Sequence, residues 1–300
     1  MADVLVAVVL LPPALVAAAA LAYLLMLYAR QQSLVFRPRA ESTGREPAGL
    51  GIPCRDVFLE CEDGVRVHGW WIAGRLPTTI VYFHGSDGNL SYELPVLRFL
   101  CQLGACVLLV DYPGYGRSGG RCSERHCYQA GEAAWSFVHG VQGVPARDVI
   151  VYGQSLGTAV ATYLAATREC GGLVFQSGFT SVPALASHLF PQVPTPLFWL
   201  LARTRMNSLR RIPSCRCPVL VLHSPADEHI PVAHARLLYS RAAGPKRFVE
   251  LHGVHSSGEW RRDERVLAAW QELIGRETGA WERQPVTTAL APTPSASGSA

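Results

Sequence analysis

The sequence predicts an α/β protein with one mostly parallel sheet of eight strands and helices on both of its faces. Short apolar runs alternate with helical segments from residue 79 onward, and such alternation is typical of βαβ units. Apolar residues make up 49% of the 300 residues and charged residues only 17%, so the chain is able to bury a large core. A long apolar run at positions 4–29 precedes this pattern. We therefore expect one globular domain behind an N-terminal membrane segment.

The apolar run at positions 4–29 carries no charged residue and exceeds the ~20 residues that a helix needs to cross a bilayer. A cleaved signal peptide is the competing interpretation. The first residues carry no positive charge, and the run is longer than the ~7–15 residues of a signal-peptide core. We therefore expect an uncleaved single-pass anchor over residues 1–30. The arginines nearest to the run are Arg30, Arg37 and Arg39, and all three follow it. The positive-inside rule therefore places the domain on the cytoplasmic side.

After a linker at residues 31–54, the globular domain is expected over residues 55–276. Two alternating runs joined by the turn Asp63-Gly64 predict a hairpin. The short apolar runs that follow predict buried strands. The eight predicted strands cover residues 56–60, 65–71, 79–83, 105–110, 149–152, 172–176, 218–223 and 247–251.

Residues 178–214 interrupt the alternation with several prolines and an apolar cluster. This segment is expected to be a small helical lid over the strand ends, although ordinary helices packed on the sheet would account for it equally well. A lid with an apolar face would favour an acyl substrate. Residues 277–300 are rich in Pro, Ser, Thr and Ala, which predicts a disordered tail.

The segment Gly153-Gln154-Ser155-Leu156-Gly157 fits the G-x-S-x-G pattern of a nucleophile elbow. An apolar run precedes it and a run of small residues follows it, as a strand-to-turn-to-helix unit requires. The glycines allow close approach of neighbouring chains, and the turn exposes the serine hydroxyl. The N–H of Leu156 is then placed to donate to an oxyanion.

A nucleophilic serine needs a base, and the base needs an acid that orients it. Asp227 follows the predicted strand at 218–223, and His255 follows the last predicted strand. Both therefore fall at the carboxyl ends of strands, where sites of parallel sheets lie. Glu228 is the alternative acid and His252 the alternative base.

The chain resembles the serine hydrolases of the α/β-hydrolase superfamily over roughly residues 55–275, and it is most similar to membrane-anchored members related to serine aminopeptidases. The resemblance implies that Ser155 is the nucleophile, His255 the general base and Asp227 its orienting acid. It also implies an oxyanion hole made by the N–H groups of Ser86 and Leu156. The matching segments are His84-Gly85 with Gly88-Asn89, the loop from Asp111 to Ser118, the pentapeptide around Ser155, Asp227 before Ile230-Pro231, and His255. The sequence departs from the family pattern at Ser224, at Ser86-Asp87 and at Ser256-Ser257.

Other classes of site find little support. The net charge is only +4 and no basic block interleaves with aromatic residues, so nucleic-acid binding is not expected. The glycines between Gly114 and Gly119 match a dinucleotide fingerprint, but Pro113 and Gly120 flank them where a helix would have to begin. The nine cysteines form no C-x-x-C pair and are expected to be reduced thiols. We expect no metal and no cofactor.

These observations predict a membrane-anchored serine hydrolase that cleaves a carboxylic ester or thioester of a small-molecule or acylated substrate. A peptidase or amidase would use the same residues, and it would need a carboxylate to bind a free amine. A catalytically silent, membrane-tethered binding module is the third possibility.

Overall fold

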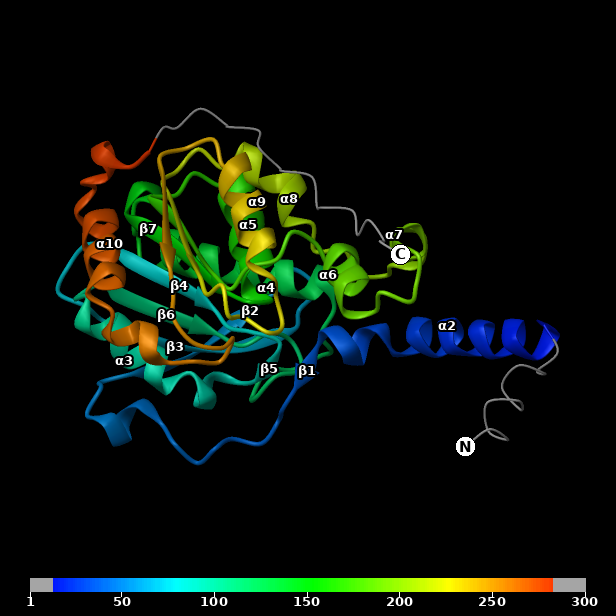
Figure 1. Cartoon of the computed structure of the whole chain (residues 1–300). Helices are drawn as coiled ribbons and strands as arrows, with labels where there is room; N and C mark the ends of the chain where they lie inside the picture. The colour runs from blue at the N-terminus through cyan, green and yellow to red at the C-terminus, as the bar shows by residue number, and fades with distance from the viewer. Residues whose placement is uncertain (1–12, 283–300) are drawn as a thin grey trace.

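The computed structural model describes residues 13–282 and contains one eight-stranded sheet at its centre (Figure 1). The predicted eight-stranded α/β architecture is confirmed. The strand order is β10-β9-β8-β7-β4-β6-β3-β2. Strands β4, β6, β7, β8, β9 and β10 run parallel to one another, whereas β3 pairs antiparallel with β6, and β2 pairs antiparallel with β3 at the edge. The strands are β2 (Arg55–Glu60), β3 (Arg66–Ile72), β4 (Thr79–Phe83), β6 (Cys106–Val110), β7 (Val149–Gln154), β8 (Gly172–Gln176), β9 (Val219–His223) and β10 (Lys246–Glu250).

The central strand β4 shows why the apolar runs form a sheet covered on both faces. All five of its residues are buried. Val81 and Phe83 belong to the core cluster on one face, and Ile80 and Tyr82 belong to the cluster on the other. Successive side chains of a strand point to opposite faces, so a strand with large apolar side chains on both faces needs a helical layer on each side.

The helices supply these two layers (Figure 1). Helices α4 (Glu124–Trp135), α5 (Gly157–Thr167), α8 (Ser208–Arg211) and α9 (Val232–Arg241) pack on one face, and α3 (Leu94–Gln102) and α10 (Glu264–Gly275) pack on the other. Ser123 caps α4 by accepting a hydrogen bond from the N–H of His126, which explains why that helix begins there. A π-helical turn continues α4 from Ser136 to Val141.

The N-terminal helix α2 (Pro13–Val35) extends away from the sheet (Figure 1). By length and composition, its segment Leu15–Val35 could cross a membrane, and none of it is buried inside the protein. The first part of the predicted anchor, residues 1–12, lies outside the described residues. The linker prediction was wrong at its start, because the helix continues through residues 31–35 and leads directly into strand β1 (Arg37–Pro38), which pairs with β5 (Asp87–Gly88).

The segment at 178–214 folds into helices α6 (Val182–Leu189) and α7 (Thr195–Leu201) before α8. Helices α6 and α7 lie beside α2 at one end of the sheet (Figure 1), where a lid was expected. At the C-terminus, the disordered tail was predicted to begin at residue 277, but the residues up to 282 are structured. Residues Thr278–Ala280 form a short helix and Trp281 is buried, because its indole packs into the core and donates to Glu272. Residues 283–300 of the predicted tail lie outside the described part of the chain.

Candidate active site

Ser155 occupies a strained turn between strand β7 and helix α5. Its φ angle is 50°, in the left-handed region that a residue with a side chain seldom adopts. Its own N–H donates to the carbonyl of Gln176 in the neighbouring strand at 2.8 Å, which helps to hold this conformation. The serine therefore stands at the carboxyl end of a central strand, as the nucleophile-elbow motif predicts.

The two glycines of the motif are required by close backbone contacts. A Cβ atom at Gly153 would lie 2.2 Å from the carbonyl oxygen of Gly157, and a Cβ atom at Gly157 would lie 2.0 Å from the carbonyl oxygen of Phe83 in β4. Neither distance is possible for real atoms. The turn therefore packs closely against both β7 and the neighbouring strand β4, and these contacts fix the position of Ser155.

His255 and Asp227 meet although they are far apart in the sequence. The Nδ1 atom of His255 donates to Oδ2 of Asp227 at 2.7 Å, and the Asp227 side chain is 0% exposed. The other carboxylate oxygen accepts the backbone N–H groups of His229 at 3.0 Å and Ile230 at 2.8 Å. The carboxylate is therefore held rigidly and can fix the orientation and tautomer of the imidazole.

These contacts also set the charge of Asp227. Burial on its own would raise the pKa of Asp227, but the hydrogen bonds from the His255 ring and from the N–H groups of Ile230 and His229 lower it below its usual value. Asp227 is accordingly ionised at neutral pH and can stabilise a positive charge on His255. Glu228, the alternative acid, accepts the backbone N–H of His255 at 2.8 Å and supports the loop instead of the ring.

One apolar cavity of about 610 Å³ brings Ser155 and His255 together. Ser86 and Leu156, the two predicted oxyanion residues, also line it. Much of its remaining wall comes from apolar residues of α6, α7 and α2. In the described part of the chain, the Ser155 hydroxyl makes no hydrogen bond to His255, so the serine–histidine contact stays a prediction. Such contacts are often long in ligand-free sites.

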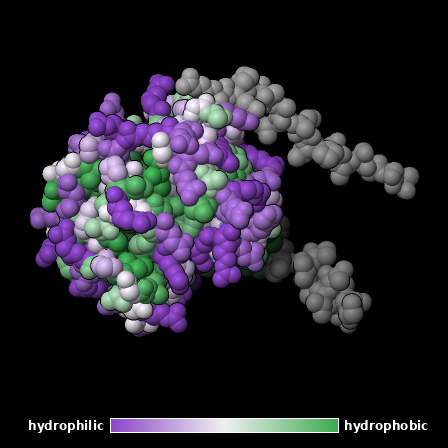
Figure 2. Space-filling view, turned by 90° about the vertical axis from the view of Figure 1, so that its left-hand side faces the viewer, coloured by the Kyte–Doolittle hydropathy of each residue, from purple (hydrophilic) through white to green (hydrophobic). Residues whose placement is uncertain are grey.

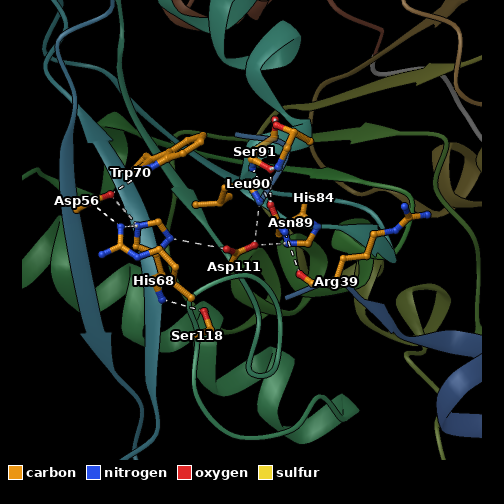
Figure 3. A network of polar contacts seen from close by, with 12 residues as sticks. Arg39, Asp56, His68, Trp70, His84, Asn89, Leu90, Ser91, Asp111 and Ser118 are labelled. Carbon is orange, nitrogen blue, oxygen red and sulfur yellow. Dashed lines mark hydrogen bonds and ion pairs between the residues drawn. The ribbon is translucent and has the colours of Figure 1, made fainter. Parts of the chain in front are cut away.

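A polar network holds the loop that carries Ser86 (Figure 3). The His84 ring donates to the carbonyl of Gly85 at 2.8 Å and lies 3.3 Å from the buried carboxylate of Asp111. Burial would lower the pKa of His84, but Asp111 raises it above its usual value. The carbonyl of Ser86 accepts the Tyr115 hydroxyl at 2.8 Å and the N–H of Arg37 at 2.9 Å. His84 and Asp111 therefore stabilise the loop, and the Arg37 N–H joins it to strand β1, directly after α2.

The other polar residues considered from the sequence lie elsewhere. His252, the alternative base, is exposed and contacts Arg265. Arg117, in the loop from Asp111 to Ser118 that matches the family pattern, pairs with Asp56 of strand β2 at 2.6 Å, so it joins this loop to the sheet edge. The described residues contain no group of three or more His, Cys, Asp or Glu placed to hold a metal ion.

Glu93 is a cavity residue that the sequence analysis missed. Its carboxylate lies 2.8 Å from the Tyr82 hydroxyl, which is also 2.6 Å from Oε1 of Gln154. A phenol has one proton to donate, so either Glu93 is protonated or the Gln154 amide is turned. Burial raises the pKa of Glu93 above its usual value, which favours the protonated carboxyl. Glu93 directly precedes helix α3, which has a proline in its first turn. Glutamate is common at the start of helices, so the sequence did not mark Glu93 as a cavity residue.

Known proteins show similarity to this chain at the level of sequence and of fold. Residues 78–231 match the family model described as alpha/beta hydrolase fold. An uncharacterized protein of Mycobacterium tuberculosis, Rv2307c, is 32% identical, covering 85% of this chain and 90% of that protein. The alpha/beta hydrolase domain-containing protein WAV2 of Arabidopsis thaliana is 29% identical, covering 77% of this chain and 82% of the relative. An uncharacterized membrane protein of Saccharomyces cerevisiae, YNL320W, is also 29% identical, over 71% of this chain and 78% of that protein.

Among solved structures, an esterase of Pyrococcus furiosus, Pf2001, superposes with a TM-score of 0.68 at 21% identity. The match covers 81% of this chain and 100% of the esterase, and at this identity it establishes the shared fold. From the family match and the arrangement of strands around Ser155, the chain belongs to the α/β-hydrolase fold family.

Proposed function

We propose that this protein is a membrane-anchored serine hydrolase that cleaves carboxylic esters or thioesters of acyl substrates. The observation that carries the proposal is a single apolar cavity lined by both Ser155, on its strained turn, and His255, whose ring is oriented by a buried Asp227. A strained nucleophile, an oriented base and an apolar wall are the elements that acyl transfer requires.

In the first half-reaction, the Nε2 atom of His255 takes the proton of Ser155 as Oγ attacks the acyl carbonyl carbon. The carbonyl oxygen becomes an oxyanion, and the N–H groups of Ser86 and Leu156 donate to it. The imidazolium then returns the proton to the leaving alcohol or thiol, and the acyl group stays on Ser155. In the second half-reaction, water attacks this ester through the same steps, releasing the carboxylic acid and restoring Ser155.

Asp227 has a positioning role in this scheme. It does not take the proton, but it holds the proton of His255 on Nδ1 and leaves Nε2 free to accept from Ser155. Its lowered pKa keeps the carboxylate charged whenever the imidazolium forms. This role requires an orientation that the 2.7 Å contact provides.

Glu93 bears on the choice between an ester and an aminoacyl amide. An aminopeptidase would need a carboxylate to bind the amine of its substrate, and Glu93 is an acidic residue that lines the cavity. However, burial raises the pKa of Glu93 above its usual value, which favours a neutral carboxyl, and a neutral carboxyl binds an ammonium group weakly. Ester or thioester cleavage is therefore the preferred proposal, with amide cleavage as the alternative.

A fluorophosphonate probe tests the nucleophile directly. The wild-type protein should be labelled at Ser155, and the label should be lost in Ser155→Ala. A folded wild-type protein that is not labelled would favour the silent binding module instead. Rates on p-nitrophenyl esters against aminoacyl p-nitroanilides then separate the two hydrolase alternatives.

The membrane location belongs to the same proposal. Helix α2 is long and apolar enough to span a bilayer, and the similar yeast protein is named a membrane protein. We infer a single span with the catalytic domain on the cytoplasmic side, since the arginines follow the apolar run. Protease protection of a C-terminal epitope in sealed vesicles tests that orientation.

A further inference from the structure

The C-terminal half of helix α2 forms part of the wall of the Ser155 cavity. The lining residues recur at intervals of three and four, so they lie on one face of the helix. Between the helix and Ser155, the cavity continues along apolar residues of α6 and α7. The α2 residues concerned are Leu24, Leu27, Tyr28, Gln31, Leu34 and Val35.

Specific hydrogen bonds hold α2 in this place. The Gln31 side chain donates to the carbonyl of Leu201 at 3.0 Å and accepts the N–H of Arg203 at 2.8 Å. Its amide thereby pairs with the backbone just where α7 ends. Farther along, the side chain of Gln192 donates to the Tyr23 hydroxyl at 2.8 Å. A helix serving only as a tether would need no such contacts with the lid.

The same end of the molecule presents apolar side chains outward. In α2, Leu25 is 57% exposed and Met26 43% exposed, and in the lid Leu200 is 75% exposed. Figure 2 shows the side of the molecule away from α2, where polar residues predominate and apolar residues occur in groups between them. Exposed apolar side chains around an apolar helix indicate contact with a membrane.

The helix that could cross a membrane is the same helix that lines the cavity. A span needs about 20 residues, and the segment Leu15–Val35 is long and apolar enough to form one. All six lining residues lie in this segment, together with Arg30 near its C-terminal end. Tyrosines are enriched where a span meets the membrane interface, so Tyr28 supports placing the cavity at the edge of the bilayer. Arg30 follows at the level of the headgroups.

We propose that α2 is a component of the substrate site and that the acyl chain of a long-chain ester residing in the bilayer enters between α2 and the helices α6 and α7. The ester carbonyl then reaches Ser155 while the distal part of the chain stays against Leu24 and Leu27. This inference rests on the proposed hydrolase function and adds the class of substrate and its route of entry. The anchor would thus select long acyl chains as well as hold the enzyme at the membrane.

A matched pair of substitutions on adjacent residues tests the inference. In the full-length protein in phosphatidylcholine vesicles, kcat/KM is measured for p-nitrophenyl palmitate and for p-nitrophenyl butyrate. Leu27→Trp narrows the cavity and should lower the palmitate-to-butyrate ratio at least tenfold. Met26→Trp adds similar bulk at an exposed position of α2 that does not line the cavity, and it should leave the ratio within twofold of wild type.

Fluorophosphonate labelling separates failure of this inference from failure of the proposed function. A wild-type protein that is folded but unlabelled would refute the hydrolase itself. A labelled wild type that hydrolyses butyrate but not palmitate would overturn the inference alone, as would an unchanged ratio in Leu27→Trp or an equal loss in Met26→Trp. If Leu27→Trp is not labelled, Leu24→Phe is the milder variant, and the same tenfold criterion applies to it.

Discussion

Replacing Asp227 by asparagine should abolish most of the activity without changing the shape of the site. Oδ1 of Asp227 accepts two backbone N–H groups, from His229 and Ile230. In Asp227→Asn the amide oxygen has to keep that position, since an NH₂ group there would face two donors. The amide NH₂ then occupies the position of Oδ2 and points at Nδ1 of His255, 2.7 Å away.

The consequence is a change of tautomer. Nδ1 of His255 must accept from the amide, so the ring proton moves to Nε2, which can no longer take the proton of Ser155. The corresponding substitution in a serine protease lowers kcat about 10⁴-fold, which equals about 5 kcal/mol in the activation free energy. Because Asp227 is fully buried and its contacts are short, we expect a loss of about 10³–10⁴-fold here.

The measurement is kcat on p-nitrophenyl butyrate, with thermal unfolding to show that the variant is folded. Glu228→Gln is the control, because its amide oxygen can still accept the backbone N–H of His255, and its kcat should stay within about threefold of wild type. A folded Asp227→Asn protein that keeps more than about a tenth of the wild-type kcat would show that Asp227 does not set the tautomer of the base.

Further variants test the fold and the cavity. Gly157→Ala should lower the free energy of unfolding by about 3 kcal/mol or more, since its Cβ would lie 2.0 Å from a backbone oxygen of β4. Gly140→Ala is the control, because a Cβ atom there has open space around it, and it should leave the free energy of unfolding nearly unchanged. Urea unfolding measures both. The pKa of Glu93 is raised by burial, so its contribution to stability is present below its usual pKa and is lost as the pH rises through the raised value. Glu93→Gln should therefore raise Tm relative to wild type more at pH 8 than at pH 5. An equal change in Tm at the two pH values would contradict a raised pKa for Glu93. Trp281→Ala should lower the free energy of unfolding by about 3 kcal/mol, because the indole is part of the core. An unchanged Tm would show that Trp281 does not contribute to the core.

Much of the fold follows from local patterns. The run 80–83 places large apolar or aromatic side chains on both faces, so it is expected to be a strand covered on both sides, and the structure buries all of these residues. The elbow could be predicted because its spacing reflects backbone contacts within a few residues of Ser155. Asp227 and His255 could be placed at strand ends by their order in the chain.

Other features depend on contacts between distant segments. Local patterns do not indicate that residues 31–35 continue α2, because Gln31 and Gln32 look like linker residues until their partners Leu201, at the end of α7, and Thr204 are known. The burial of Trp281 likewise depends on a space beside Glu272, and the partner of Glu93, the Tyr82 hydroxyl, comes from the preceding strand β4.

The sequence by itself determined the class of fold, the elbow and the residue types that can perform acyl transfer, because strand burial and tight turns follow from short-range sterics. Only the tertiary structure decided which carboxylate orients His255, and that the proposed membrane anchor contributes a wall of the cavity. Side-chain direction across a loop, and the packing of one helix against another, depend on atoms that lie tens or hundreds of residues away in the chain.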